Sequence, residues 1–239
     1  MTYEPNVAAV AALIADPARA AMLTALLDGK ALPAGELAYA SGVTAQTASS
    51  HLAKLLTGGL VAVESEGRHR YYRLAGAQIA QALEQLASIR PAGPVRRRAL
   101  SAEAKELRFA RCCYDHLAGQ IGVAVTQALA ERRLILPAPE KRFEITPAGV
   151  AWFGGLGLDC AALKPARRGL ARQCLDWTER SHHLAGPLGV AFLRALCARG
   201  WLRRSRNSRA VRVTPTGHLE LKRRLGVDPT AIAGEFSYV

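Results

Sequence analysis

Residues 36–56 read Glu36-Leu-Ala-Tyr-Ala-Ser-Gly-Val-Thr-Ala-Gln-Thr-Ala-Ser-Ser-His-Leu-Ala-Lys-Leu-Leu56. Apolar residues follow helical spacing on both sides of Gly42, and Thr44 is placed to cap the second helix. Two helices joined by so short a turn are typical of a helix-turn-helix, whose second helix is free to enter the major groove of DNA. The residues expected to be buried are Leu37, Val43, Ala48, Leu52 and Leu55.

The second helix of this motif leaves a polar face outside. Its short hydrogen-bonding side chains suit base edges and phosphates. The predicted DNA contacts in this stretch are Thr44, Gln46, Thr47, Ser49, Ser50, His51 and Lys54. The alternative interpretation of the face is an ordinary solvated helix surface. For His51 there is a further alternative to a DNA contact, in which its side chain packs at the centre of the motif.

The flanking residues complete a winged helix. Asp16 is expected to cap a helix that has Pro17 at its first position, where a missing N–H costs little. A hairpin after the motif carries Arg68, His69 and Arg70 near its tip, where they are placed to reach the DNA backbone or minor groove. The predicted helices are residues 7–15, 16–27, 32–41, 45–56 and 76–89, and the predicted strands are 60–63 and 69–74, joined by a turn at 64–67.

Several segments match one known family in order: Ala15-Asp-Pro-Ala-Arg19, Gly35-Glu-Leu-Ala38, residues 47–52, Gly59-Leu-Val61 and Gly67-Arg-His-Arg-Tyr-Tyr-Arg-Leu74. Through them residues 6–89 resemble the winged-helix repressors of the arsenical-resistance (ArsR) type. The resemblance implies a homodimeric, cytoplasmic repressor that leaves its operator when an effector binds. It also implies that the helices before and after the wing form the dimer interface.

Two metal sites of that family lack their ligands here. Arsenic-sensing members carry a Cys-x-Cys pair on the helix expected at residues 33–40, which contain no cysteine. Zinc-sensing members carry Asp/His and His/Glu pairs on the helix after the wing, but residues 77–89 have no histidine and one acid, Glu84. The resemblance therefore does not imply metal sensing by residues 1–89, and the signal is expected to enter elsewhere.

Charge divides the chain into two parts. The net charge of the whole chain is +13, but residues 1–89 carry −1 and residues 90–239 carry +14. Residues 90–98, Arg-Pro-Ala-Gly-Pro-Val-Arg-Arg-Arg, have the composition of a linker. The predicted organisation is a DNA-binding and dimerisation domain at 1–89, a basic linker at 90–100, an effector-sensing domain at 101–228 and a tail at 229–239.

The second part contains an internal repeat. Ala110-Arg-Cys-Cys-Tyr-Asp115 matches Ala171-Arg-Gln-Cys-Leu-Asp176, and His116-Leu-Ala-Gly119 matches His183-Leu-Ala-Gly186, so residues 177–182 are inserted in the second copy. Further on, Thr146-Pro-Ala-Gly149 matches Thr214-Pro-Thr-Gly217. Each copy is expected to run helix, helix, strand, turn, strand, helix. The predicted fold class is mainly α with small β-hairpin wings (α+β), with two pseudo-symmetric winged-helix-like repeats after the first domain.

Cysteine, histidine and aspartate gather where the two copies match. Thiolate, imidazole and carboxylate are suitable ligands for zinc or another borderline metal, although the spacing contains no Cys-x-x-Cys. A small-molecule pocket between the copies and ordinary core packing are the two alternatives to a metal site. Because Cys112 and Cys113 are adjacent, oxidation of their thiols is a further interpretation. The candidate effector-binding residues are Cys113, Tyr114, Asp115, His116, Cys174, Asp176, Trp177, His182 and His183.

Composition excludes several other classes. Hydrophobic residues make up 50% of the chain, which is enough to form a core, and an apolar run of membrane-spanning length is missing. Five cysteines do not form a disulfide framework, so a reducing cytoplasm is expected. Neither a glycine-rich phosphate loop nor a recognisable Ser/His/Asp order is present, so the chain is not expected to be an enzyme.

The sequence thus predicts a DNA-binding transcriptional regulator, a dimeric repressor released by an effector bound in the second domain. The alternative is a metal- or thiol-based sensor that uses the repeats. The expected partners are double-stranded operator DNA, a second copy of the chain and a small-molecule or ion effector, without a membrane. No cofactor is expected to be required, but a metal ion in the second domain is possible. Residues 203–209 contain four arginines, for which three interpretations stay open: a solvated loop, a second wing that contacts DNA phosphates, or a site for another anion.

Overall fold

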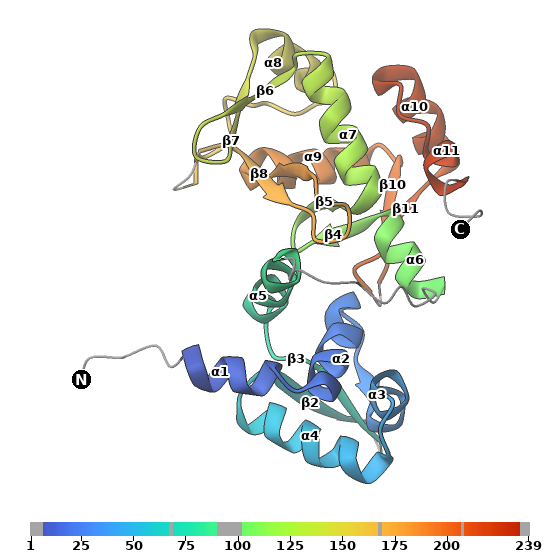
Figure 1. The fold of residues 1–239 in the computed structure, drawn as a ribbon. Helices are drawn as coiled ribbons and strands as arrows, with labels where there is room; N and C mark the ends of the chain where they lie inside the picture. Colours follow the sequence, from blue (N-terminus) through green and yellow to red (C-terminus); the bar gives the residue numbers. More distant parts are fainter. Residues whose placement is uncertain (1–6, 67–68, 90–101, 167–168, 207, 235–239) are drawn as a thin grey trace. The chain divides into compact units, whose positions relative to one another are not determined.

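The computed structural model describes residues 7–66, 69–89, 102–166, 169–206 and 208–234. The chain divides into two compact units, residues 1–87 and 88–239, close to the boundary expected after residue 89 (Figure 1). Arg68, the predicted linker at 90–100 and residues 235–239 of the predicted tail lie outside the described residues.

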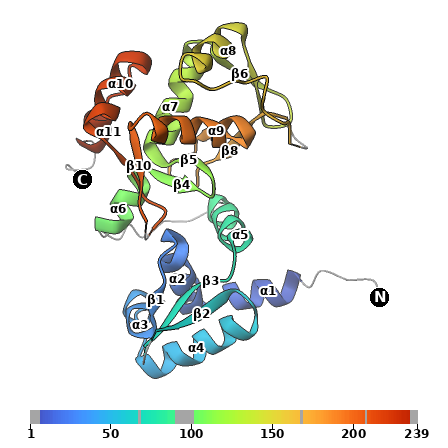
Figure 2. The same cartoon turned by 180° about the vertical axis from the view of Figure 1, so that it is seen from behind.

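The first unit has the element order of a winged helix, as predicted (Figures 1 and 2). Helix α4 is the second helix of the motif and follows α3 after a short turn. The helices are α1 (Val7–Ile14), α2 (Pro17–Ala25), α3 (Ala34–Ser41), α4 (Ala45–Thr57) and α5 (Ala77–Ser88), with a 3₁₀ turn at Leu26–Asp28. The strands are β1 (Leu32–Pro33), β2 (Val61–Glu66) and β3 (His69–Leu74).

Local chemistry fixes the helix ends where the sequence predicts them. The Asp16 carboxylate accepts a hydrogen bond from the Arg19 amide at 2.9 Å and caps α2. Gly42 ends α3 with φ of 68°, a left-handed conformation that side chains other than glycine rarely adopt. Thr44 Oγ1 then accepts from the Thr47 amide at 3.2 Å and caps α4.

Two predicted boundaries in this unit are wrong because a three-stranded sheet, ordered β1-β3-β2, extends further than expected. The third helix does not start at Leu32, since Leu32 and Pro33 pair with β3. The residue before a proline favours extended backbone, which is consistent with this short strand. The predicted turn at 64–67 starts too early, because Glu64 pairs with Tyr71 and β2 runs to Glu66.

The core of the first unit confirms the predicted inward face of the motif. Leu37, Ala48, Leu52 and Leu55 are fully buried, and Val43 packs against them. Met22 and Leu23 of α2 and Val61 and Tyr72 of the wing complete this cluster. The apolar side of α4 is thus fixed against α2, α3 and the sheet, which leaves its polar side outward.

The second unit contains two copies of a hairpin–helix–hairpin–helix unit, preceded by α6 (Ala102–Phe109). The first copy is β4 (Arg111–Cys113), β5 (His116–Ala118), α7 (Gly119–Glu131), β6 (Ile135–Ala138), β7 (Arg142–Ile145) and α8 (Pro147–Gly154). The second is β8 (Ala171–Leu175), β9 (His182–Ala185), α9 (Gly186–Ala198), β10 (Leu202–Arg204), β11 (Val211–Val213) and α10 (Pro215–Leu225). Helix α11 (Pro229–Gly234) occupies the start of the predicted tail.

This order corrects the expectation that each copy begins with two helices. The matched segments 110–115 and 171–176 form strands, β4 and β8, and each copy starts with a hairpin. Short strands of this kind depend on a partner strand from elsewhere in the chain, which local sequence does not reveal. The helix, strand, turn, strand and helix predicted next are present in each copy, as α7 to α8 and α9 to α10, so the predicted order is wrong only at the start of each copy.

The two copies exchange hairpins. Strand β8 of the second copy pairs with β7 of the first, with Phe143 opposite Ala171, and makes the sheet β6-β7-β8-β9. Reciprocally, Arg111 of β4 forms a bridge with Ala210, just before β11. The first hairpin of each copy therefore lies against the second hairpin of the other copy, and neither copy is complete alone.

The repeated Thr-Pro-x-Gly sequence has a structural cause. Thr146 and Thr214 each cap the following helix by accepting from the amide of the glycine, at 3.0 Å in both copies. A Cβ on Gly149 or on Gly217 would clash with a main-chain carbonyl of the preceding hairpin. A side chain is therefore excluded at both positions, which explains why the two copies share this motif.

A single core, built mainly from α7, α9 and the hairpins, fills the second unit. Phe153 and Phe192 meet edge to face near its centre, with ring centroids 5.4 Å apart. Among the described residues no single helix is long and apolar enough to cross a membrane. Helices at Val7–Ile14 and Pro17–Asp28 together pass that test of length and composition, but they meet at a bend of 86°.

Candidate functional site: a recognition helix and a Cys/His quartet

Helix α4 presents the predicted polar face to solvent. Gln46, Thr47, Ser49, Ser50 and Lys54 are all exposed, while Ala48, Leu52 and Leu55 on the opposite side are buried. The Thr44 hydroxyl lies 2.9 Å from the Thr47 hydroxyl and also caps the helix. Thr44 therefore has a structural role in addition to the DNA contact predicted for it.

His51 belongs to a polar cluster that joins three helices. Its Nδ1 lies 3.5 Å from an Arg19 guanidinium nitrogen and 3.8 Å from Asp16 Oδ1. Arg19 also donates to the carbonyls of Ala12 and Leu13 at the end of α1. The side chain of His51 is only 16% exposed. These contacts favour the packing interpretation of His51 over a DNA contact.

The wing offers one described basic side chain near its tip. Arg70 is exposed, and its guanidinium carbon lies 5.7 Å from the centre of the Tyr72 ring. Arg73 is paired with Glu64 on the neighbouring strand. Arg68 and the side chain of His69 lie outside the described part of the chain, so their predicted contacts remain predictions.

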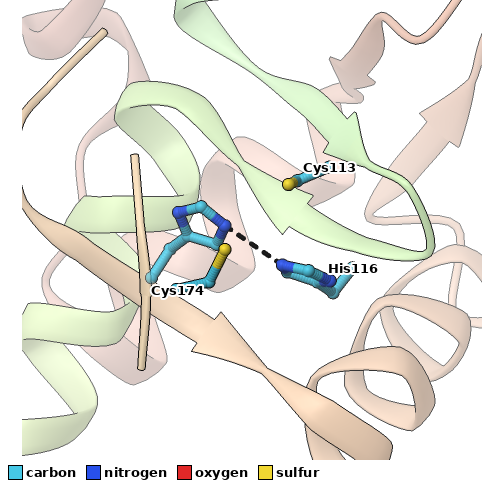
Figure 3. A group of neighbouring side chains, drawn as sticks. Cys113, His116 and Cys174 are labelled. Atoms are coloured by element: carbon cyan, nitrogen blue, oxygen red, sulfur yellow. Dashed lines mark hydrogen bonds between the residues drawn. The ribbon is translucent and has the colours of Figure 1, made fainter. Parts of the chain in front are cut away.

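In the second unit four of the predicted effector residues converge (Figure 3). Cys113 lies directly opposite His116 in the β4–β5 hairpin, and Cys174 lies directly opposite His183 in the β8–β9 hairpin. One ligand atom from each of the four lies within 4.8 Å of all the others. We call Cys113, His116, Cys174 and His183 the Cys/His quartet. Each repeat supplies one cysteine and one histidine to it.

The two histidines of the quartet face each other through the same nitrogen. His116 Nε2 lies 3.1 Å from His183 Nε2, the contact marked in Figure 3, and the ring centroids are 5.0 Å apart. The other nitrogen of each ring faces an aspartate of its own repeat. His116 Nδ1 lies 2.9 Å from Asp115 Oδ1, and His183 Nδ1 lies 3.4 Å from Asp176 Oδ2. Both rings are therefore held between a carboxylate and the shared centre.

The surroundings shift the pKa values of several of these groups. Burial lowers the pKa of His116, but hydrogen bonds with Asp115 and Cys113 outweigh it and raise the pKa to about 9. The hydrogen bond with His116 in turn lowers the pKa of Asp115. Burial raises the pKa of the neighbouring Cys112 thiol to about 11, and its Sγ contacts the Tyr114 carbonyl oxygen at 3.2 Å. Cys112 is thus a protonated core thiol beside the quartet.

Asp176 is also a structural anchor. Its Oδ1 accepts from Arg111 at 2.7 Å and its Oδ2 accepts from the Gly119 amide at 2.8 Å. Burial raises the pKa of Asp176, but Arg111 and these hydrogen bonds hold it well below its usual range. Sequence reasoning missed Arg111, although the matched Ala-Arg pairs of the repeat place an arginine at this position in both copies.

The remaining predicted effector residues lie outside the quartet. Trp177 stacks on Arg111, whose guanidinium carbon is 5.3 Å from the ring centre. Tyr114 occupies the β4–β5 turn with a positive φ of 67°. His182 precedes a quartet ligand in a strand, so its side chain points to the other face of the sheet. None of the three belongs to the quartet.

Comparison with known proteins finds relatives among transcriptional regulators. A helix-turn-helix domain family matches residues 14–64. The HTH-type transcriptional regulator YdfF of Bacillus subtilis is 44% identical over 223 residues, which cover 93% of this chain and 98% of YdfF. The similarity therefore extends through both units.

A second relative matches a shorter stretch of the chain. The HTH-type transcriptional regulator CmtR of Mycobacterium tuberculosis is 41% identical over 92 residues, which cover 37% of this chain and 77% of CmtR. The solved structure of this cadmium sensor aligns with 35% identity over 40% of this chain and 98% of its own, with a TM-score of 0.32. The chain belongs to the ArsR-type winged helix-turn-helix family of DNA-binding transcriptional regulators.

Proposed function

We propose that this protein is a repressor that binds its operator through α4 and the wing and is released by an effector bound in the second unit. The observation that carries the first part is the exposed row Gln46, Thr47, Ser49 and Ser50 on a helix whose other side is fully buried. Amide and hydroxyl groups on such a helix match the hydrogen-bond pattern of base edges in the major groove. Lys54 and Arg70 are the described candidates for phosphate contacts.

We also infer that the repressor is a homodimer. One winged helix reads one half-site, and two recognition helices about one helical turn apart double the contact with DNA. The apolar side chains Val7 and Val10 of α1, Leu86 of α5 and Ile89 after it are exposed, between 44% and 72%. Exposed apolar residues on these two helices fit an interface between copies, the position that the family resemblance implies.

The second unit is the proposed sensory half. Residues 1–89 contain neither of the two familiar metal sites of the family. In contrast, the Cys/His quartet gathers side chains of two repeats at one point. This favours the alternative that the effector is a metal ion or an oxidant of thiols over a small molecule held by Tyr114 and Trp177.

DNA binding tests the proposal directly. Duplexes selected from genomic fragments by the purified full chain serve as probes, and the double variant Gln46→Ala, Ser50→Ala is compared with the parent. Loss of a base-reading side chain is expected to cost about 1–3 kcal/mol at its position and to relax sequence preference there. Gln127→Ala, an exposed glutamine on α7 of the second unit, is the control. Equal affinity of the double variant and the parent would contradict the assignment of α4.

A further inference from the structure

The Cys/His quartet has nearly the dimensions of a tetrahedral metal site. Zinc binds nitrogen at about 2.0–2.1 Å, so two nitrogens on one tetrahedral ion lie about 3.3 Å apart. The facing Nε2 atoms of His116 and His183 are 3.1 Å apart, and one ligand atom from each of the four residues lies within 4.8 Å of the others. Small side-chain shifts are therefore enough to place four ligands around one ion.

The hydrogen bonds around the histidines also suit a metal. Metal-binding histidines commonly donate their second N–H to a carboxylate, which fixes the ring and directs the other lone pair at the ion. Asp115 occupies this position for His116 at 2.9 Å, and Asp176 lies 3.4 Å from the equivalent nitrogen of His183. His183 Nδ1 is buried and forms no hydrogen bond of good geometry to any described residue. A metal on Nε2 would keep the proton on Nδ1, directed towards Asp176.

A positive charge would also suit the centre of the quartet. If both Nδ1 atoms carry protons that face aspartates, both Nε2 atoms carry lone pairs, and two lone pairs 3.1 Å apart repel each other. A proton or a cation between them removes this conflict. Two thiols at the same point favour the cation, because two thiolates neutralise a divalent ion and make it less costly to bury.

We propose that the Cys/His quartet binds one cation of the zinc class, such as Zn²⁺ or Cd²⁺, in a tetrahedral site shared by the two repeats. We further propose that this cation is the effector, a step that rests on the proposed function. Two sulfur and two nitrogen ligands form a closed set of the kind that zinc prefers. The site lies in the second unit, away from the positions that the family uses in the first.

Metal titration of the reduced, chelator-stripped full chain tests the site. Co²⁺ serves as the spectroscopic probe and Zn²⁺ as its competitor, and we expect one equivalent with the visible absorption of a thiolate-bound tetrahedral ion. Cys174→Ser and His183→Ala are each expected to weaken metal binding more than about 100-fold. This exceeds the loss of about 10- to 100-fold that is typical when a residue hydrogen-bonded to a metal ligand is replaced. Cys112→Ser and Cys197→Ser are matched controls that keep the site, and circular dichroism checks that every variant is folded.

Three results would overturn the site. One is less than stoichiometric binding by the folded parent, and another is unchanged affinity in folded Cys174→Ser and His183→Ala. Rapid formation of a Cys113–Cys174 disulfide in place of metal binding, seen by mass spectrometry, would also overturn it and indicate a thiol switch.

DNA binding with and without Zn²⁺ tests the effector role. We expect the metal to lower the affinity for the selected duplex by about 5- to 150-fold in the parent and to leave His183→Ala unchanged. Linkage requires that DNA weaken metal binding by the same factor. Stoichiometric metal binding without a change in DNA affinity would overturn the effector role and keep the site. Failure to bind DNA in either state would instead contradict the proposed function, because metal titration is independent of it.

Discussion

Arg111 of the first repeat donates to Asp176 of the second across 2.7 Å, and the two side chains are 2% and 0% exposed. Removal of one partner of a buried ion pair leaves an uncompensated charge and typically costs about 3–5 kcal/mol. We expect Arg111→Ala to lower the free energy of unfolding of the second unit by about this amount. All three tryptophans, Trp152, Trp177 and Trp201, lie in that unit, so urea unfolding followed by tryptophan fluorescence measures it.

Arg172 provides the matched control for this experiment. It is the repeat equivalent of Arg111. The hydrogen bond with His116 lowers the pKa of Asp115, and the charge of Arg172 adds to this effect on a side chain that is 63% exposed. An exposed pair contributes at most about 1 kcal/mol. Arg172→Ala is therefore expected to be much less destabilising than Arg111→Ala. Equal losses in the two variants, confirmed by circular dichroism, would show that burial of the Arg111–Asp176 pair does not determine its contribution.

Elements determined by residues close together in the sequence were predicted correctly, and elements that depend on residues far apart were not. Asp16, Gly42 and Thr44 act on residues within three positions, and the structure confirms the helix boundaries they predicted. The β4 and β8 hairpins depend on partners such as Ala210 and Phe143, far away in the chain. Their short strands carry too little local pattern to be distinguished from helix.

For the candidate metal site, the sequence predicted the residues but not their convergence. All four quartet residues were among the nine candidates, because the repeat brings Cys and His to matching positions. Their convergence depends on hairpin register: Cys113 faces His116 across a two-residue turn, and Cys174 faces His183 across a longer loop that holds the insertion. The insertion lies beyond the pair and leaves its register intact. The repeat in the sequence identified the equivalent residues, but it could not show that the four side chains meet at one point.

Asp115 is expected to tune the metal affinity without being a ligand. It holds Nδ1 of His116 at 2.9 Å, and loss of such a partner typically weakens metal binding by about 10- to 100-fold. Asp115→Asn keeps the shape of the side chain and removes its charge. Competition with a chromophoric chelator measures the affinity, with Asp159→Asn, another aspartate of the second unit, as the control. Equal affinity in the two variants would show that Asp115 does not support the ligand.

Asp16 is expected to give the start of α2 a pH-dependent stability. The hydrogen bond from the Arg19 amide lowers the pKa of Asp16 below the usual value of about 3.8. Stabilisation by the carboxylate is therefore present above this value and is lost as the pH falls through the lower pKa of the folded state. Asp16→Ala should increase hydrogen exchange of the Arg19 amide at neutral pH. Asp16→Asn should keep the cap but lose this acid dependence; an acid dependence equal to that of the parent would contradict the assignment.

The apolar residues exposed on α1 and α5 predict a dimer that a single charge disrupts. Val10 is 44% exposed on α1, and burial of a glutamate at an interface carries a large desolvation penalty. The parent is expected to sediment as a dimer at micromolar concentration, and Val10→Glu is expected to sediment as a monomer. Leu219→Glu, at a residue that is 71% exposed in the second unit, is the control and should leave the dimer unchanged. A monomeric parent, with or without DNA, would exclude the proposed interface.

Lys54 and Gln46 lie on the same exposed side of α4 but are expected to affect DNA binding in different ways. A lysine on a phosphate releases counterions when DNA binds, so its loss should reduce the slope of log K against log salt concentration by about 0.9 per half-site. A glutamine on a base edge releases none, and its loss should change sequence preference while the slope stays the same. Titrations of Lys54→Gln and Gln46→Ala at several salt concentrations, each on the selected duplex and on a duplex with one altered position, separate the two roles. A lower slope in Gln46→Ala together with an unchanged slope in Lys54→Gln would reverse the assignment, and α4 would then lie in the groove in a different orientation from the one proposed.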